Sequence, residues 1–216
     1  MKNETRMSDN GTWCPLSGPG IFPTAICIFM AAAIISFTGC KKEEDEIPDE
    51  SIITVIDVTD HFVEWIYFSF SDDTIVKSEP EDAATDTGWD LGIRYQNFRT
   101  NGGESGPGQG GVYDLGKTDF SAVTLASKEG VDFVEDDMIT VLESEAMPPS
   151  WIEVSGSVPM EDMFTTPTGP DRTYAPNMHV YILKSAEGRH IKIKGVSFFD
   201  DYGDEGHIKL RWEFLD

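Results

Sequence analysis

Strict alternation of apolar and charged residues near the C-terminus constrains the fold of this chain more than any other feature. Residues 190–194 read His-Ile-Lys-Ile-Lys, and residues 208–214 read Ile-Lys-Leu-Arg-Trp-Glu-Phe. Because side chains alternate between the two faces of a β-strand, each segment is expected to have one buried and one solvent-exposed face. Gly-containing connections at residues 185–188 and 200–206 fit hairpin turns. The C-terminal part is therefore predicted to be an antiparallel β-meander.

The rest of the chain after residue 50 also favours strands over helices, because no segment shows a sustained helical period of apolar residues. Runs of β-branched and aromatic residues occur instead at residues 61–70, 89–95, 131–133, 139–142, 151–154 and 180–184. Residues 143–177 hold six of the 12 prolines, which indicates long loops. We predict an all-β fold, a single domain of antiparallel sheets over residues 51–216 with long loops in its second half.

The N-terminal part differs in composition and is typical of a secretory signal. Two cations, Lys2 and Arg6, precede an apolar run over residues 21–37, and Phe-Thr-Gly stands directly before Cys40. A cysteine after small residues resembles the lipobox of a bacterial lipoprotein, which implies cleavage before Cys40 and lipidation of its sulfur. The alternative is an uncleaved transmembrane helix, although the run is at the short limit for one. Residues 1–39 are thus predicted to be a signal peptide and residues 40–50 a lipidated acidic tether.

Charge and cysteine content exclude several classes of protein. The net charge of -23 repels phosphate backbones, so nucleic-acid binding is not expected. Cys14 and Cys27 would leave with the signal, so cysteine catalysis and cysteine metal sites are not expected either. The acidic run at residues 43–46 resembles an export signal, which favours an outer-membrane lipoprotein that faces the cell exterior; the alternative is a plain spacer.

Sequence motifs of enzymes are missing. The chain has no G-x-S-x-G elbow, and its four histidines lie in or beside predicted strands without a catalytic signature around them. The glycine-rich loop at residues 101–111 lacks the Lys-Ser/Thr end of a P-loop. The acidic residues from Asp200 to Glu205 are interpreted as a solvated turn rather than a Ca²⁺ loop. We expect a binding protein and not an enzyme; a hydrolase with two close carboxylates in a cleft is a further alternative, although nothing in the sequence asks for it.

Methionine is distributed unevenly. Five of the eight methionines fall within residues 138–178, in the window that overlaps the predicted loops: Met138, Met147, Met160, Met163 and Met178. Methionine usually fills apolar cores, but its thioether is also a soft ligand for copper and for haem iron. Loop positions favour the ligand interpretation, while Met138 and Met178 look like strand residues and are expected in the core.

A family resemblance sharpens this choice. Residues 89–94, 100–106 and 110–112 resemble the W-D-hydrophobic…T-N-G-G-x-S-G…G-G-V block of the HmuY family. Residues 65–69 resemble its W-x-Y-F-S strand, and residues 180–193 resemble its V-Y-hydrophobic-R-T-A-D-G-K-Y-Y-K-L strand pair. Gly206, His207 and Ile208 begin a segment like its terminal strand. The blocks occur in the family's order and cover most of residues 60–216.

The resemblance implies a haem-scavenging surface lipoprotein that passes haem to an outer-membrane TonB-dependent type receptor. Members hold haem between two axial side chains from loops, two His in some members and Met in others. Because no His pair occurs in residues 138–178, Met/Met ligation is expected here, with Met147 first and Met163 or Met160 second. His179 is a reserve ligand. The alternative is a non-haem surface module of the same fold that binds a glycan, a protein or another porphyrin.

The remaining residues of the predicted site are its walls and its charges. Apolar walls would come from Trp151, Phe164 and Tyr174, with Arg172 and Lys184 as the nearest cations for the propionates. The block at Trp89, Asp90, Asn101, Gly102 and Gly103 is instead expected to be structural. In this interpretation Trp89 fills the core, Asp90 caps backbone amides and Asn101-Gly102 supplies turn geometry.

Overall fold

The computed structural model describes residues 53–71, 74–144, 146–165 and 173–215. The predicted signal peptide at residues 1–39, the lipidated Cys40 and the tether at residues 40–50 lie outside the described residues. Arg172 also lies outside them. Within the described ranges, no helix has the length and hydrophobicity that crossing a membrane requires.

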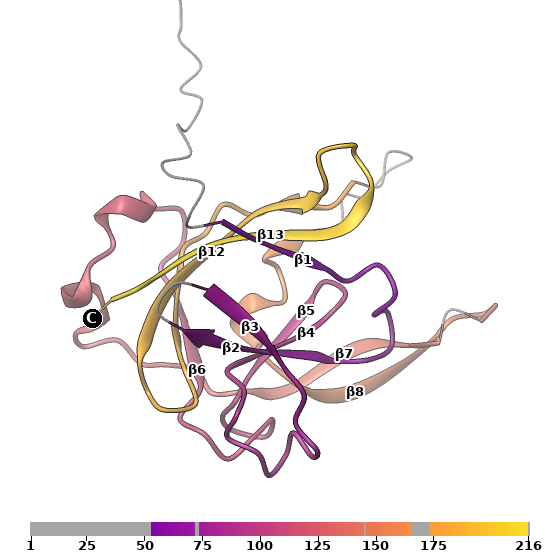
Figure 1. Ribbon diagram of the computed structural model, residues 1–216, viewed down its shortest axis with the longest axis horizontal. Coiled ribbons are helices and arrows are strands. Elements are labelled where there is room, and N and C mark those ends of the chain that lie inside the picture. Colours follow the sequence, from indigo (N-terminus) through magenta and orange to yellow (C-terminus); the bar gives the residue numbers. More distant parts are fainter. Residues whose placement is uncertain (1–52, 72–73, 145, 166–172, 216) are drawn as a thin grey trace, which may run out of the picture. The chain divides into compact units, whose positions relative to one another are not determined.

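A five-stranded antiparallel sheet contains the predicted meander. Its order is β1 (Ile53–Asp57), β13 (Glu205–Phe214), β12 (His190–Phe199), β11 (Tyr181–Lys184) and β6 (Gly111–Asp114). Leu183 pairs with Ile191, and Ile193 pairs with Trp212, so β11, β12 and β13 follow one another as neighbours (Figure 1). The C-terminal meander is confirmed.

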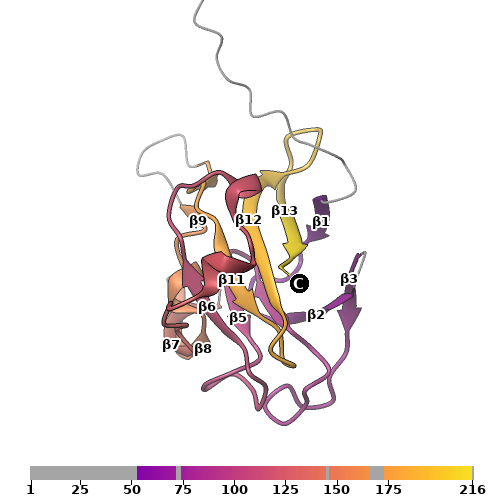
Figure 2. The same cartoon turned by 90° about the vertical axis from the view of Figure 1, so that its left-hand side faces the viewer.

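A second antiparallel sheet has the order β3 (Thr74–Ser78), β2 (Ile66–Ser71), β4 (Leu91–Arg94) and β5 (Asn97–Thr100). Two two-stranded ladders complete the described sheets, β7 (Asp137–Ser144) with β8 (Ser150–Gly156) and β9 (Phe164–Thr165) with β10 (Ala175–Pro176). Figure 2 shows β2 and β3 on the same side of the molecule as β1 and β13, with β7 and β8 on the other side. The predicted all-β fold is confirmed.

Short 3-10 helices connect these strands at Phe120–Ala122, Leu125–Lys128 and Val158–Met160. Two strand predictions need correction. Residues 61–65 form a loop, and β2 begins only at Ile66. Residues 131–133 are not a strand; the ladder there is reduced to a single bridge between Val112 and Val134.

One apolar core joins the two larger sheets. Its members on the strands include Ile66, Phe68, Leu91, Ile93, Phe98, Tyr181, Leu183, Ile191, Ile193, Phe198, Leu210 and Trp212. Phe70 of β2 meets Trp212 of β13 edge to face, with ring centroids 5.1 Å apart. The alternation in β12 and β13 therefore places their apolar residues on the face that packs against the second sheet.

The opposite face of the meander is less exposed to solvent than the alternation predicts. A second apolar cluster of Phe120, Val123, Val180, Ile182 and Leu215 covers part of it. Lys192 is buried beneath this cover, where its Nζ donates to the carbonyl of Val123 at 3.2 Å and pairs with Glu213 at 3.1 Å. The sequence pattern shows which residues share a face, but it does not show which loop folds over that face.

The Trp-and-glycine block is structural, as predicted. Trp89 is fully buried and donates its indole N–H to the carbonyl of Ala83. The carboxylate of Asp90 accepts the N–H of Phe70 at 2.8 Å and the N–H of Ala186 at 2.7 Å, so it caps backbone amides of both sheets. One part of the prediction is wrong: positive φ falls on Gly103 and not on Asn101 or Gly102. Gly102 instead permits a close approach, because a Cβ there would lie 2.2 Å from the carbonyl oxygen of Gly110.

Replacing Asp90 by Ala is expected to lower the free energy of unfolding by about 2 kcal/mol, because two buried N–H groups would lose their acceptor. Urea unfolding measures this change. Asp132→Ala, at an exposed position, is the matched control and should shift stability by less than about 0.5 kcal/mol. Equal stability of the two variants would contradict the role given to Asp90.

The contribution of Asp136 to the free energy of unfolding is expected to change with pH in the direction opposite to that usual for an aspartate. Its buried carboxylate accepts the N–H and the hydroxyl of Thr100 at 2.7 and 2.8 Å, and burial raises its pKa to about 6. Because this folded pKa lies above the unfolded value of 3.8, the folded state binds the proton more tightly. The contribution of Asp136 to stability therefore grows as pH falls through 6 toward 4 and is lost above 6.

Urea unfolding of wild type and Asp136→Asn between pH 7 and pH 4 tests this expectation. The free energy of unfolding of wild type, relative to that of Asp136→Asn, should rise by up to about 3 kcal/mol as the pH falls. Asp132→Asn, at an exposed position, is the matched control for an Asp-to-Asn change. A difference between wild type and Asp136→Asn that stays constant from pH 7 to pH 4 would refute the expectation.

Candidate functional site

The hairpin β7–β8 carries the first predicted ligand at its end. Ser144 pairs with Ser150, and Met147 lies in the connection between them with 92% of its surface exposed. Figure 1 shows this hairpin extending away from the rest of the strands. The structure therefore presents the Met147 thioether to solvent on a projecting element.

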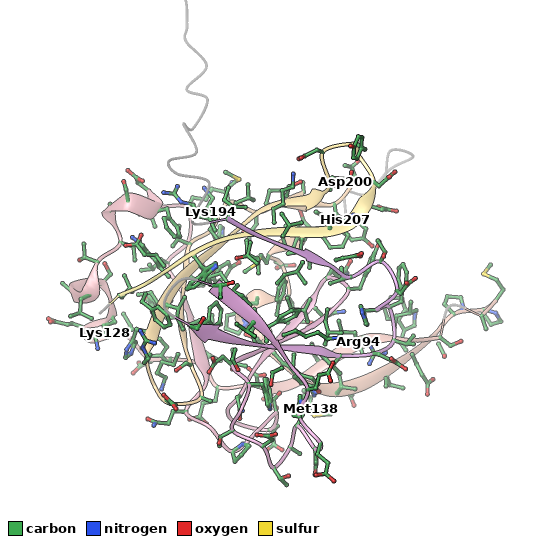
Figure 3. All side chains as sticks on the ribbon, in the orientation of Figure 1. Arg94, Lys128, Met138, Lys194, Asp200 and His207 are labelled. Carbon is green, nitrogen blue, oxygen red and sulfur yellow. The ribbon has the colours of Figure 1, made fainter. Side chains whose placement is uncertain are left out.

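The two faces of the hairpin differ in exposure. Ile139 and Val141 point into the protein and are buried, whereas Trp151 is 61% exposed and pairs with the half-buried Leu142 across the ladder. Met138 lies on the same outer face and is 50% exposed (Figure 3). The prediction that Met138 belongs to the core is wrong, because the period of two places it opposite Ile139.

Met160 and Met163 occupy a different environment from Met147. Both side chains are fully buried members of the main core. Met163 packs so closely on β12 that a Cβ at Gly195 would lie 3.0 Å from its Cγ. In this structure neither thioether is accessible from solvent, and the three candidate methionines do not meet on one surface. The Met/Met pair remains a prediction.

Met178 is also outside the core, contrary to prediction. It is 37% exposed and has a φ of 66°, an uncommon conformation for a residue other than glycine. The side chain of Asn177 accepts the N–H of His179 at 2.9 Å and donates to the hydroxyl of Tyr181 at 2.7 Å. This short loop, rather than a strand, sets the orientation of His179.

The reserve ligand His179 has one ring nitrogen engaged. Its Nδ1 lies 2.9 Å from Oδ2 and 3.1 Å from Oδ1 of Asp114, at the end of β6. The carboxylate favours a proton on Nδ1, which leaves the Nε2 lone pair for another partner. Both side chains are about one-third exposed.

The predicted wall residues are only partly brought together. Phe164 is buried and Tyr174 is half-buried, and both rings lie against Phe198 of β12, with centroids 5.4 and 4.5 Å away. Trp151 lies instead on the outer face of the hairpin. Of the predicted cations, Lys184 lies 5.0 Å above the ring of Phe133, which packs on the second apolar cluster.

Sequence reasoning missed two aromatic residues that extend this contact toward the surface. Tyr95 lies 5.0 Å from Phe198 and 5.6 Å from Tyr174, and it stacks on Phe62 at 4.2 Å. Phe62, Tyr95, Tyr174 and Phe198 are called the aromatic column below. Tyr95 occupies the two-residue turn between β4 and β5 with a φ of 51°. The sequence carried no signal for this contact, because the left-handed φ of Tyr95 is a property of the folded backbone.

Arg94 connects the aromatic column to the base of the β7–β8 hairpin. Its guanidinium donates to the carbonyl of Phe62 at 3.2 Å and to the carbonyl of Leu142. Figure 3 shows Arg94 beside β7. Burial lowers the pKa of this arginine, so its two carbonyl partners compensate for lost hydration. The column and the hairpin are therefore neighbours because one buried cation binds both.

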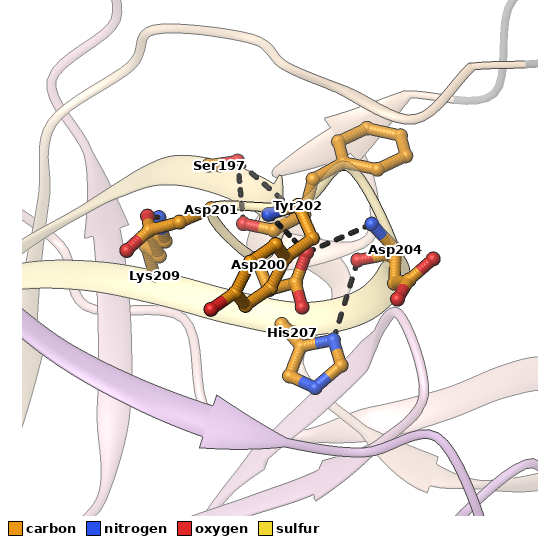
Figure 4. A network of polar contacts seen from close by, with 8 residues as sticks. Ser197, Asp200, Asp201, Tyr202, Asp204, His207 and Lys209 are labelled. Atoms are coloured by element: carbon orange, nitrogen blue, oxygen red, sulfur yellow. Dashed lines mark hydrogen bonds and ion pairs between the residues drawn. The ribbon is translucent and has the colours of Figure 1, made fainter.

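The acidic connection between β12 and β13 uses its carboxylates internally. Asp200 accepts the N–H groups of Tyr202 and Asp204, each at 2.8 Å, and Asp201 pairs with Lys209 at 2.6 Å (Figure 4). These amide hydrogen bonds lower the pKa of Asp200. The interpretation as a turn is confirmed. Within the described ranges, no group of three or more His, Cys, Asp and Glu side chains is placed to hold a metal ion.

A polar pocket of about 180 Å³ lies elsewhere, and its lining includes Ser69, Asp90, Glu187 and Arg189. This volume is below the roughly 300–1,000 Å³ typical of sites for drug-sized ligands. The pocket is thus a poor match to a porphyrin, and the hairpin with the aromatic column remains the candidate site.

Comparison with known proteins agrees with this architecture. The model of the HmuY protein family matches residues 62–212. The chain belongs to the HmuY family. The match spans the aromatic column, Arg94, the β7–β8 hairpin and the meander. No functionally curated protein matches the chain.

Solved structures share the fold at low sequence identity. A protein of Bacteroides vulgatus assigned as HmuY-like and heme-binding is 19% identical, with a TM-score of 0.56 over 74% of this chain and 89% of the other. A protein of Bacteroides fragilis assigned as a lipoprotein is 18% identical, with a TM-score of 0.57 over 76% and 90%. The apo HmuY analog of Tannerella forsythia is 20% identical, with a TM-score of 0.53 over 76% and 95%.

Replacing Arg94 by Met is expected to loosen the junction between the hairpin and the column, since two carbonyls lose a charged donor worth about 1.5–3 kcal/mol each. Hydrogen exchange should accelerate in residues 61–64 and 139–144 and stay unchanged in β12. Lys77→Met, on the exposed edge strand β3, is the control. Uniform acceleration across the protein, or none, would contradict this local role.

Proposed function

We propose that this protein is a cell-surface haem-binding protein and not an enzyme. Membership of the HmuY family carries the proposal, and the Bacteroides vulgatus neighbour, assigned as heme-binding, supports it. A carrier needs a binding face that cargo can enter and leave. A projecting hairpin beside a partly exposed aromatic column meets that need better than the small polar pocket does.

Met147 is the proposed first axial ligand. A thioether is neutral and soft, which suits haem iron in an apolar setting. The exposure of Met147 supports its assignment, because its sulfur can meet iron without any rearrangement of the core. The proposed apolar walls are Trp151 on the same hairpin, Tyr174 of the aromatic column and Phe164 beside it.

Met163 or Met160 is the proposed second ligand, with His179 in reserve. Either methionine would have to leave the core to reach iron, at a cost of about 2–5 kcal/mol if the site is left empty. His179 requires no such step, because its side chain is already about one-third exposed. The carboxylate of Asp114 also orients its ring. Haem spectra distinguish these cases, since thioether and imidazole ligands give different absorption bands.

The proposal also includes the location of the protein and the receptor to which it passes haem. Lipidation of Cys40 and the acidic tether would hold the protein on the outer membrane, facing the exterior. From there it would pass haem to a TonB-dependent type receptor. The Bacteroides fragilis neighbour assigned as a lipoprotein supports the anchored location.

Titration of the purified protein with haemin, followed by absorbance, tests the function and its first ligand. A Soret shift is expected for wild type, and Met147→Ala should weaken binding at least about tenfold, the effect of losing roughly 1.4 kcal/mol. Met138→Ala is the matched control, because Met138 is an exposed methionine of the same hairpin.

Two outcomes would count against the proposal. No Soret shift for wild type would reject haem binding. An unchanged spectrum for the Met147→Ala, Met163→Ala double variant would reject the proposed Met ligands. A loss in Met163→Ala alone has to be read against its unfolding curve, because that side chain also fills the core.

A non-haem surface module of the same fold is the second candidate. The observation in its favour is the dispersal of the five methionines, from fully buried Met160 and Met163 to nearly fully exposed Met147. Iron-free protoporphyrin separates the two candidates. Equal affinity for haemin and protoporphyrin would favour a module that binds porphyrin through its aromatic column, without axial ligands.

A further inference from the structure

The five methionines of residues 138–178 differ widely in their access to solvent. Met147 is 92% exposed, Met138 is 50% exposed and Met178 is 37% exposed, whereas Met160 and Met163 are at 0%. Oxidants dissolved in water reach a thioether only where its sulfur is accessible. The structure therefore ranks these side chains by their reactivity, with the proposed ligand first.

The relevant chemistry is oxygen transfer from a peroxide. The O–O bond of hydrogen peroxide breaks, one oxygen bonds to Sδ, and the remaining atoms leave as water. The sulfur is oxidised by two electrons and the peroxide is reduced by two. The product, methionine sulfoxide, is polar and chiral, and reductases return it to the thioether.

We propose that Met147 is a peroxide-sensitive switch, whose oxidation to the sulfoxide turns off haem capture; this rests on the proposed function of Met147 as an axial ligand. Oxidation uses one of the two sulfur lone pairs and lowers the donor strength of the sulfur, and it adds a hard sulfoxide oxygen, which is a poorer match to haem iron than a thioether. The switch acts on the same atom that binds the cargo.

The position of Met147 makes this switch local. Its side chain lies at the end of a hairpin and is almost wholly in solvent, so a polar sulfoxide there disturbs no core packing. Oxidation of Met160 or Met163 would instead place a polar group inside the main core and destabilise the fold. Loss of haem binding without loss of stability is thus the signature of Met147 oxidation.

The experiment uses the full chain with Met138→Leu and Met178→Leu, so that Met147 is the accessible methionine of residues 138–178. The protein is treated with hydrogen peroxide, and peptide mass spectrometry follows each methionine with time. Haemin titration and thermal unfolding are measured before and after treatment. The same chain with Met147→His is the matched control, since imidazole also ligates haem iron and forms no sulfoxide.

Met147 should be oxidised at least tenfold faster than Met160 and Met163. The oxidised protein should bind haemin at least tenfold more weakly, with an unchanged unfolding temperature, and methionine sulfoxide reductases should restore binding. Haemin affinity of the Met147→His chain should not respond to peroxide.

Two results would overturn the switch and separate it from the proposed function. If the untreated protein binds haemin and oxidation of Met147 leaves the affinity unchanged, the switch alone is rejected. If the untreated protein does not bind haemin, the proposed function and the switch are both rejected, whatever the order of oxidation. Equal oxidation rates at Met147 and Met163 would also reject the switch.

Discussion

The two sheets of this protein depend on one buried carboxylate. Asp90 accepts one N–H from β2 and one from the turn between β11 and β12, so it fixes the second sheet to the C-terminal meander at a defined position. Burial raises its pKa, and the two amide hydrogen bonds compensate in part for the lost hydration. This alignment agrees with the Phe70–Trp212 contact in the core that the two sheets share.

A buried cation has the matching role for the proposed site. Arg94 ends β4 inside the protein and binds a carbonyl from the 61–65 loop and another from β7. This arrangement places the aromatic column at the base of a hairpin whose end is free to project. The hairpin is a two-stranded ladder that packs with one face only, so its outer face can carry the exposed Trp151, and its connecting loop carries the exposed Met147.

The contrast between Met147 and Met163 shows why a composition signal needs a structure. Both were ligand candidates because methionine is soft and both fall in a Pro-rich window. In the fold, Met163 fills a gap left by Gly195 on β12 and belongs to the core, while Met147 belongs to the surface. Residue type identifies a possible ligand, but accessibility decides whether it can meet cargo without a rearrangement.

The all-β class, the C-terminal meander and the structural role of Trp89 and Asp90 could be predicted from the amino-acid sequence, because alternation and turn residues are local properties. It did not show that a loop carrying Phe120 covers Lys192, or that Phe62, Tyr95 and Tyr174 meet. These contacts, and the different exposures of the methionines, are visible only in the tertiary structure. The contacts join residues far apart in the chain, and a period of two assigns a side chain to a face of a strand without showing what packs on that face.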